Sequence, residues 1–220
     1  MADPQGLDLR EAVDGLTGYA YADLNALWRD LPADPVLARE ALNDVLPALV
    51  TVYGEAAATL AADWYDDLRE SVGPRQRFAA IPAGFADTGA YALVGWATTR
   101  AVDATSLRSL VEGGVQRRVA NFSRQTVMTS AVKDPAATGW QRIGAGECRS
   151  GFCDLLIGRG TVYQTESSAT FASHDHCKCG AVPAWGGEPL PVRPYTPSTR
   201  VTDADRERTR EWFKENRPTP

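Results

Sequence analysis

The residues best able to bind a metal or to take part in catalysis lie together in one short segment of the chain. All four cysteines and both histidines of this 220-residue sequence lie between Cys148 and Cys179. Thiolate and imidazole are the ligands that zinc prefers, and two ligand groups separated by a short excursion are typical of a structural zinc site. The two groups are Cys148 with Cys153, and then His174, His176, Cys177 and Cys179.

Zinc takes four ligands in such a site, and this segment offers two sets of four. One set is all thiolate, with Cys148, Cys153, Cys177 and Cys179. In the other set His174 replaces one thiolate, because it stands about one turn before Cys177. A segment of ~50 residues buries too little surface to hold its turns together by packing alone, so a metal would have a structural task here. The sequence therefore predicts structural zinc.

Other chemistry remains open at the same residues. The thiols could form disulfides, or they could stay reduced and buried. A catalytic metal needs a nearby carboxylate base, and Asp154 and Asp175 do not stand at a spacing typical of one. Cys153 with His174 or His176 is a candidate nucleophile and base for a peptidase. A metal nuclease built on His174 and His176 is disfavoured, because the segment carries few basic residues that would contact DNA.

The first part of the chain must position this segment, and its apolar spacing predicts helices. We expect helices over residues 7–31, 35–72, 91–102 and 107–127. Asp34-Pro35 is a typical helix start and Gly73-Pro74 a typical end, while Pro47 should kink or split the second helix. The glycine pair Gly113-Gly114 indicates either tight helix packing or a break in the fourth helix.

After Pro135 the sequence becomes rich in glycine, and short strands are expected at 140–143, 160–163 and 180–185. Arg159-Gly160 would form a turn between the two halves of the cysteine segment. A proline-rich arm over 186–200 precedes a charged helix at 203–215. The predicted fold class is thus mostly α with a small α+β, zinc-knuckle-like region. The predicted domains are a helical N-terminal region (1–134), the knuckle (135–185), and an arm with a terminal helix (186–220).

Charge and hydropathy exclude several classes of protein. The chain has 23 Lys and Arg against 28 Asp and Glu, a net charge of −5, and the acidic excess belongs to the helical half. That balance disfavours a general nucleic-acid binder and favours protein contact. The sequence has no apolar run long enough to predict a transmembrane helix, and its first residues do not predict a secretory signal. We therefore expect no membrane partner and no secretion.

Several stretches together resemble one family, the Mu F-like minor head proteins of tailed phages, in the versions found in phages of actinobacteria. The resemblance covers most of residues 7–185, and the cysteine and histidine ending is its most specific part. It departs from the family in the first cysteine pair, which is commonly separated by two residues and here by four. The stretches are Leu7-Asp-Leu9-Arg10 through Leu27-Trp28, Arg124-Gln-Thr-Val127, Asp134-Pro135, Gly139-Trp140-Gln-Arg142, Cys153-Asp-Leu-Leu-Ile-Gly-Arg159-Gly160-x-x-Tyr163, and Phe171 to His174-x-x-Cys177-x-Cys179.

The resemblance implies a virion protein that is made in the cytoplasm of the bacterial host and takes part in head assembly, in the head interior or at the portal vertex. Its implied partners are the portal, the major capsid protein and the connector, with weak contact to packaged DNA and several copies in each particle. Some members are labelled capsid maturation proteases, so a prohead peptidase is the alternative function. A nuclease or toxin-like effector carried in the head is a third reading. The sequence itself offers no Gly-x-Ser-x-Gly or His-Glu-x-x-His motif in support of an enzyme.

Overall fold

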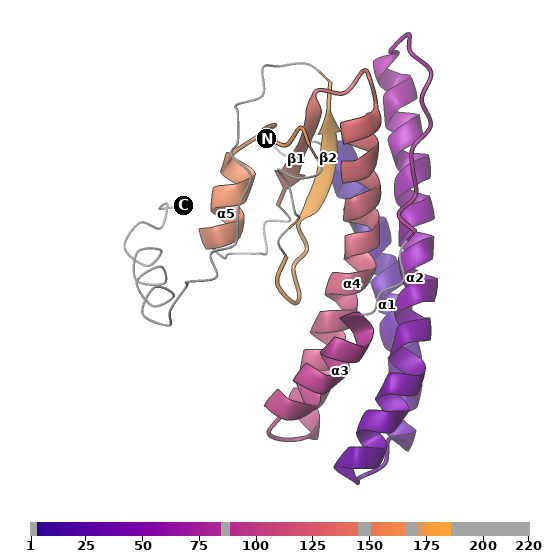
Figure 1. Ribbon diagram of the computed structural model, residues 1–220, viewed down its shortest axis with the longest axis vertical. Coiled ribbons are helices and arrows are strands. Elements are labelled where there is room, and N and C mark those ends of the chain that lie inside the picture. Colours follow the sequence, from indigo (N-terminus) through magenta and orange to yellow (C-terminus); the bar gives the residue numbers. More distant parts are fainter. Residues whose placement is uncertain (1–3, 85–88, 145–150, 166–170, 172, 186–220) are drawn as a thin grey trace.

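The computed structural model describes residues 4–84, 89–144, 151–165, 171 and 173–185. Four helices form an elongated bundle, and a two-stranded sheet with a short helix lies on one side of it (Figure 1). The predicted fold class is confirmed. Cys148, the proline-rich arm and the expected terminal helix lie outside the described residues. The elements are α1 (Pro4–Asp30), α2 (Pro35–Val72), α3 (Gly89–Arg100), α4 (Ala104–Lys133), β1 (Gly139–Ile143), α5 (Gly151–Gly158) and β2 (Gly180–Ala184).

The longest helix, α2, begins and ends as its sequence predicts. The Asp34 carboxylate accepts hydrogen bonds from the backbone N–H groups of Val36 and Leu37 and caps the first turn. Gly73 ends the helix with a left-handed φ of 70°, a conformation that costs glycine little. Pro47 does not split α2, which continues through it as one helix. The expected split is therefore wrong, because the buried side chains of Leu46, Leu49 and Val50 hold the inner side of the helix through the turn that lacks a hydrogen bond.

Close contact between helices explains the glycines of the bundle. A Cβ atom at Gly54 in α2 would lie 2.5 Å from ring carbons of Phe122 in α4. A Cβ atom at Gly114 would likewise lie 2.3 Å from a methyl carbon of Leu93 in α3. Helix α4 runs unbroken through Gly113 and Gly114. Of the two expectations for this glycine pair, tight packing is the correct one.

A buried ion pair joins the C-terminal ends of α2 and α4. Arg69 donates through Nε to Oδ2 of Asp134 at 2.7 Å, and through Nη2 to Oδ1 at 3.2 Å. The Tyr65 hydroxyl donates to the same carboxylate, and so does the backbone N–H of Ala136. Asp134 also ends α4 as its C-cap residue. One buried carboxylate therefore sets where the helical part stops and where the chain turns toward the sheet.

The small sheet is antiparallel and packs against α4, with one edge near α1. Trp140 of β1 pairs with Pro183 of β2. The strand expected at 160–163 is wrong: Tyr163 forms only a single bridge to Trp140. Helix α5 was not expected, because glycines at both of its ends masked an eight-residue apolar helix. The expected turn at Arg159-Gly160 does follow α5, with φ of 63° at Gly160.

Among the described residues, only α2 is long and apolar enough to meet the criteria for a membrane-spanning helix. Its most apolar 18-residue window has a mean hydropathy of 1.5, and 44% of that window is buried inside the protein. Counting uninterrupted apolar runs missed this helix, because a few charged residues divide it. In the structure α2 is packed by α1, α3 and α4, as the core helix of a bundle is.

Candidate metal centre

Three cysteines meet beneath the sheet. Cys153 comes from the first turn of α5, and Cys177 and Cys179 come from the loop that leads into β2. Their sulfur atoms lie within 4.8 Å of one another, and all three side chains are buried. None of the three forms a disulfide with another described cysteine. Zinc–sulfur bonds of ~2.3 Å in tetrahedral geometry place sulfurs roughly 3.8 Å apart, so the cluster could hold a metal ion.

His174 stands beside this cluster, and its Nε2 atom lies near Cys153 but not within 4.8 Å of all three sulfur atoms. That atom lies 3.6 Å from Sγ of Cys153, close to the nitrogen–sulfur separation of about 3.5 Å in a tetrahedral zinc site. The other ring nitrogen, Nδ1, lies 2.7 Å from the carbonyl oxygen of Asp175. A carbonyl only accepts, so Nδ1 must carry the hydrogen, and Nε2 keeps its lone pair for a metal. Two residues are therefore candidates for the fourth ligand, His174 and Cys148. Cys148 lies outside the described residues.

His176 does not join the cluster but faces α4. A Cβ atom at Gly113 would lie 2.4 Å from Nε2 of His176, so the imidazole occupies the space that this glycine leaves. His176 also has a φ of 60°, in the left-handed region that non-glycine residues rarely adopt. The turn is closed by the N–H of Cys177, which donates to the carbonyl of His174 at 3.2 Å. The ring in its notch and the closed turn hold His174 and Cys177 on the same side of the loop.

Side chains of α4 hold the metal loop by its backbone. Arg124 donates through Nη2 to the Cys177 carbonyl at 2.6 Å and through Nε to the Cys179 carbonyl at 2.8 Å. Gln116 donates to the Cys177 carbonyl at 2.9 Å. Asn121 accepts from Arg124 and from Ser173. Because these α4 residues are spaced by three to five positions, they form one polar ridge that faces the loop.

The electrostatics of the ridge favour thiolate. Arg124 is almost fully buried, and burial lowers the pKa of its guanidinium to about 10, although the neighbouring Cys177 and Cys179 act the other way. The pKa of the Cys177 thiol is lowered to about 4, first by a hydrogen bond with the Cys179 side chain and further by the charge of Arg124. Metals bind the thiolate form, so the protein presents this ligand ready to coordinate.

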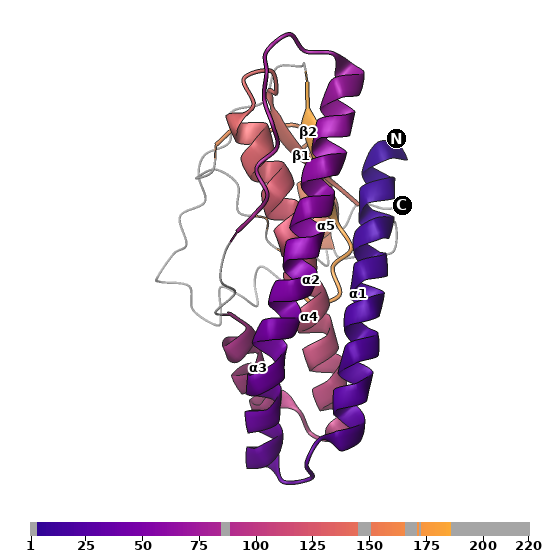
Figure 2. The same ribbon diagram turned by 90° about the vertical axis from the view of Figure 1, so that its right-hand side faces the viewer.

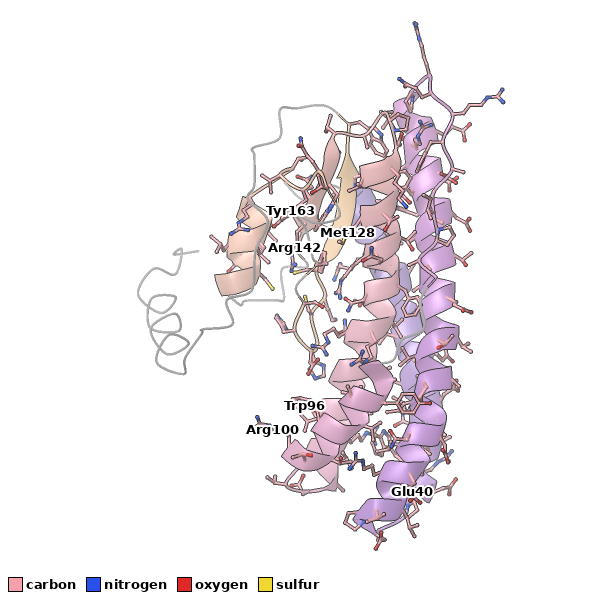
Figure 3. All side chains as sticks on the ribbon, viewed as in Figure 1. Glu40, Trp96, Arg100, Met128, Arg142 and Tyr163 are labelled. Atoms are coloured by element: carbon pink, nitrogen blue, oxygen red, sulfur yellow. The ribbon has the colours of Figure 1, made fainter. Side chains whose placement is uncertain are left out.

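An aromatic stack packs the sheet side of the centre. The Trp140 ring stacks on Tyr163, with ring centroids 4.4 Å apart, and also on Phe171, with ring centroids 5.8 Å apart. Arg142 lies over Phe171 at 3.8 Å from the ring centroid, and Arg124 lies within 4.8 Å of it. Figure 3 shows Arg142 and Tyr163 between α5 and the sheet. Rings and guanidinium groups thus fill the space around the cysteine loop and keep it rigid.

Sequence reasoning named the cysteines and His174 as candidate ligands but not Arg124 and Gln116 as residues that hold the loop. Polar residues on an amphipathic helix give no sign of which loop they will meet, since 53 positions separate Arg124 from Cys177. The role of Gly113 was also hidden, because its partner His176 comes from the far end of the fold.

Comparison with protein families then places the chain. A family described as VG15 protein matches residues 1–204. The chain belongs to the VG15 protein family. This is a viral family, so the phage origin implied by the resemblance agrees with it, whereas the finer assignment to Mu F-like minor head proteins stays a prediction. No curated protein and no solved structure matches the chain.

Proposed function

We propose that this VG15 family member is a structural and assembly component of a tailed-phage head, of the Mu F-like minor head type, stabilised by structural zinc. The observation that supports a structural metal is the burial of the thiols of Cys153, Cys177 and Cys179 together with the grip of Arg124 on the loop. A catalytic metal keeps one position open to substrate, whereas buried thiolates favour a closed site. Zinc, when bound, would tie α5 to the loop before β2.

The fourth ligand is the point on which the two sets predicted from the sequence differ. We propose His174, because its Nε2 faces Cys153 and its Nδ1 is already engaged by a carbonyl. Three thiolates and one imidazole around Zn²⁺ carry a net charge of −1, which the buried guanidinium of Arg124 balances. An all-thiolate site with Cys148 would carry −2, which Arg124 and the equally buried Arg142 could balance together, so the choice of His174 rests on its position beside Cys153.

Zinc binding is tested by native mass spectrometry and by competition with a chromophoric chelator. We expect one zinc per chain, and His174→Ala should lower zinc affinity by more than the roughly 10–100-fold typical of a change beside a ligand. Cys148→Ser should leave affinity within about twofold. His176→Ala is the comparison, since this histidine faces α4 and shapes the loop without being a proposed ligand, so its loss should lower zinc affinity less than loss of His174. Protein free of metal, with Cys148 or Cys153 in a disulfide to Cys177 or Cys179, would contradict structural zinc.

The head-assembly role is proposed from the viral family, the resemblance and the acidic helical half. We expect the chain at the portal vertex or in the head interior, in contact with portal, connector or major capsid protein. Electron cryomicroscopy of particles carrying a tagged chain, together with complementation of a phage lacking the gene, tests this. A phage that assembles full heads without the chain, or purified particles that lack it, would overturn the proposal.

One observation bears on the peptidase alternative: Cys153 and His174 are 3.6 Å apart, as a nucleophile and its base would be. A nucleophilic cysteine is partly exposed, however, and Cys153 is fully buried. The test is processing of other head proteins in phage carrying Cys153→Ala or His174→Ala. Blocked processing with intact head structure would favour the peptidase, and normal processing would remove it.

A further inference from the structure

Helix α2 has an apolar stripe on the side that faces away from the bundle. An α-helix turns by about 100° per residue, and the side chains of this stripe all leave the helix axis within one arc of about 100°. Leu37, Val45 and Val52 are 52%, 38% and 62% exposed. The stripe, which we name the α2 stripe, consists of Leu37, Ala41, Val45, Ala48, Val52 and Ala56.

No described element covers the α2 stripe. Figure 2 looks onto this side of α2, with α1 along one flank and the segment that follows α2 along the other flank of its C-terminal half. The core residues of the first half of α2, such as Leu42, Leu46 and Val50, point to the opposite side. A surface helix is normally polar where it faces water, and one that is apolar on both sides has two partners. The bundle supplies only one of them.

On α2 itself the exposed charge along the stripe is of one sign, whereas Arg75 and Arg77 of the segment that follows the helix line the same hollow as Glu70. Glu40, shown near the start of α2 in Figure 3, and two further acids lie along one edge of the stripe. The same face then continues into acids in the second half of the helix. Each of these side chains is exposed and forms no ion pair with a described residue. Helix α2 has two basic residues: by helical position Arg39 lies on the side away from the stripe, and Arg69 is buried. The acids are Glu40, Asp44, Glu55, Asp63, Asp67 and Glu70.

We propose that the α2 stripe binds a helix of another protein. That helix would have an apolar stripe of its own, with Lys or Arg along its edge and beyond its end. Apolar contact along the stripe would supply the buried area, and basic side chains would pair with the acidic edge and the acidic end. Spacing of three and four residues along Ala41, Val45, Ala48 and Val52 matches the seam of a two-helix coiled coil. The inference deepens the proposed assembly function, on which it rests for the partner being a protein.

Charge separates this partner from the other occupants of an apolar helix face. A second copy, paired antiparallel about Ala48, would set Val45 against Val52 but would also bring Asp44 of one copy near Glu55 of the other. Like charges at that position oppose pairing. A lipid surface is disfavoured because cytoplasmic leaflets are anionic and repel an acidic face.

The test uses the purified full chain and two synthetic helices of about three heptads, alike in their Leu and Ala seam. One carries Lys at the flanking positions and the other carries Glu. We expect fluorescence anisotropy to show binding of the Lys peptide that weakens as salt rises, and binding of the Glu peptide that is at least about tenfold weaker.

Variants locate the binding. Val45→Lys with Val52→Lys should weaken binding of the Lys peptide by at least about tenfold, while Val102→Lys should stay within about twofold. Val102 is the matched control, a valine 89% exposed outside the stripe. Glu40→Gln with Asp44→Asn and Glu55→Gln should remove most of the salt dependence and leave the apolar contribution. Circular dichroism confirms that each variant is folded.

Four results would overturn the inference. These are no binding of the Lys peptide, equal binding of both peptides, a dimer in sedimentation that Val52→Lys dissociates, and flotation of the chain with anionic vesicles. Because peptide binding is measured on purified protein, it is scored separately from zinc content and from the presence of the chain in particles. Failure of either proposal therefore leaves the other measurement interpretable.

Discussion

Replacing Arg124 with methionine is the most direct perturbation of the metal centre that leaves every proposed ligand in place. Arg124 is buried, donates to the carbonyls of Cys177 and Cys179, and also donates to Oδ1 of Asn121 at 2.8 Å. Methionine has a similar length and volume but no charge and no donor. The change therefore removes the grip of α4 on the loop without opening a large cavity.

The expected magnitude follows from the contacts that are lost. Three hydrogen bonds from a charged group contribute roughly 1.5–3 kcal/mol each, and loss of a buried charge returns several kcal/mol of desolvation free energy. The Cys177 carbonyl also keeps its donor from Gln116. We expect the free energy of unfolding to fall by about 2–4 kcal/mol, which lowers the melting temperature by about 5–15 °C for a chain of this size. Zinc affinity should fall by about 10–100-fold, because the negative centre loses its balancing cation.

Chelator competition measures the zinc affinity, and thermal unfolding followed by circular dichroism measures stability. Arg124→Lys keeps the charge but cannot reach both carbonyls with one fork, so it should retain more zinc affinity than stability. Arg108→Met is the control, since Arg108 lies on the same helix and pairs with Glu112 at the surface. If Arg124→Met binds zinc as tightly as the natural chain and melts within about 1 °C of it, the ridge of α4 does not support the centre.

Three further outcomes test the bundle. Asp134→Asn should lower the free energy of unfolding by about 3 kcal/mol in urea titrations, because it leaves the buried charge of Arg69 without its counter-ion; an unchanged midpoint would contradict this. Burial alone would raise the pKa of the Asp134 carboxyl, but hydrogen bonds from Arg69 and from the Ala136 N–H, with the charge of Arg69, hold it below its ordinary value. Its contribution is therefore present above the unfolded pKa of about 3.9 and is lost as pH falls through the lower folded value, so stability should fall more steeply below about pH 5 in the natural chain than in Asp134→Asn; equal slopes would refute the assignment. Gly54→Ala should cost about 1–2 kcal/mol in calorimetry, since the new methyl group meets the Phe122 ring and the clash exceeds the gain in helix propensity of up to ~1 kcal/mol; a stabilised variant would show that the ring can move.

Local signals in the sequence predicted the helical part well. Asp34-Pro35 and Gly73 mark the ends of α2 by capping chemistry that depends on only a few neighbouring residues. The ends of α4 were predicted less well: the helix expected over 107–127 extends over Ala104–Lys133, with Asp103 as its N-cap and Asp134, held by Arg69, as its C-cap. Crowding of cysteine and histidine pointed to the metal centre, because ligands of a small site lie close in sequence.

What could not be predicted depends on contacts between distant segments. Nothing near His174 and His176 in the sequence distinguishes the histidine that faces the cysteines from the one that faces α4; the notch at Gly113 makes that choice. Tyr163 was assigned to a strand, but its ring stacks on Trp140 and its backbone forms one bridge only. In each case tertiary packing decides between alternatives that local propensity leaves equal.

The two sides of the bundle differ in how their apolar surface is used. On one side α4 and the sheet share a continuous core, in which Trp140, Val162 and Cys177 are buried together with residues of α2 such as Tyr65. The metal centre therefore braces the side of the bundle that is already internal to the chain. The α2 stripe lies on the other side (Figure 1), where no described residue buries it. A rigid metal-braced side would allow α2 to present a fixed surface, because its inner face is held by the same core that the cysteines close. The proposed zinc site and the proposed docking at the α2 stripe would thus have separable tasks, and a variant in one should leave binding at the other intact as long as the bundle is folded.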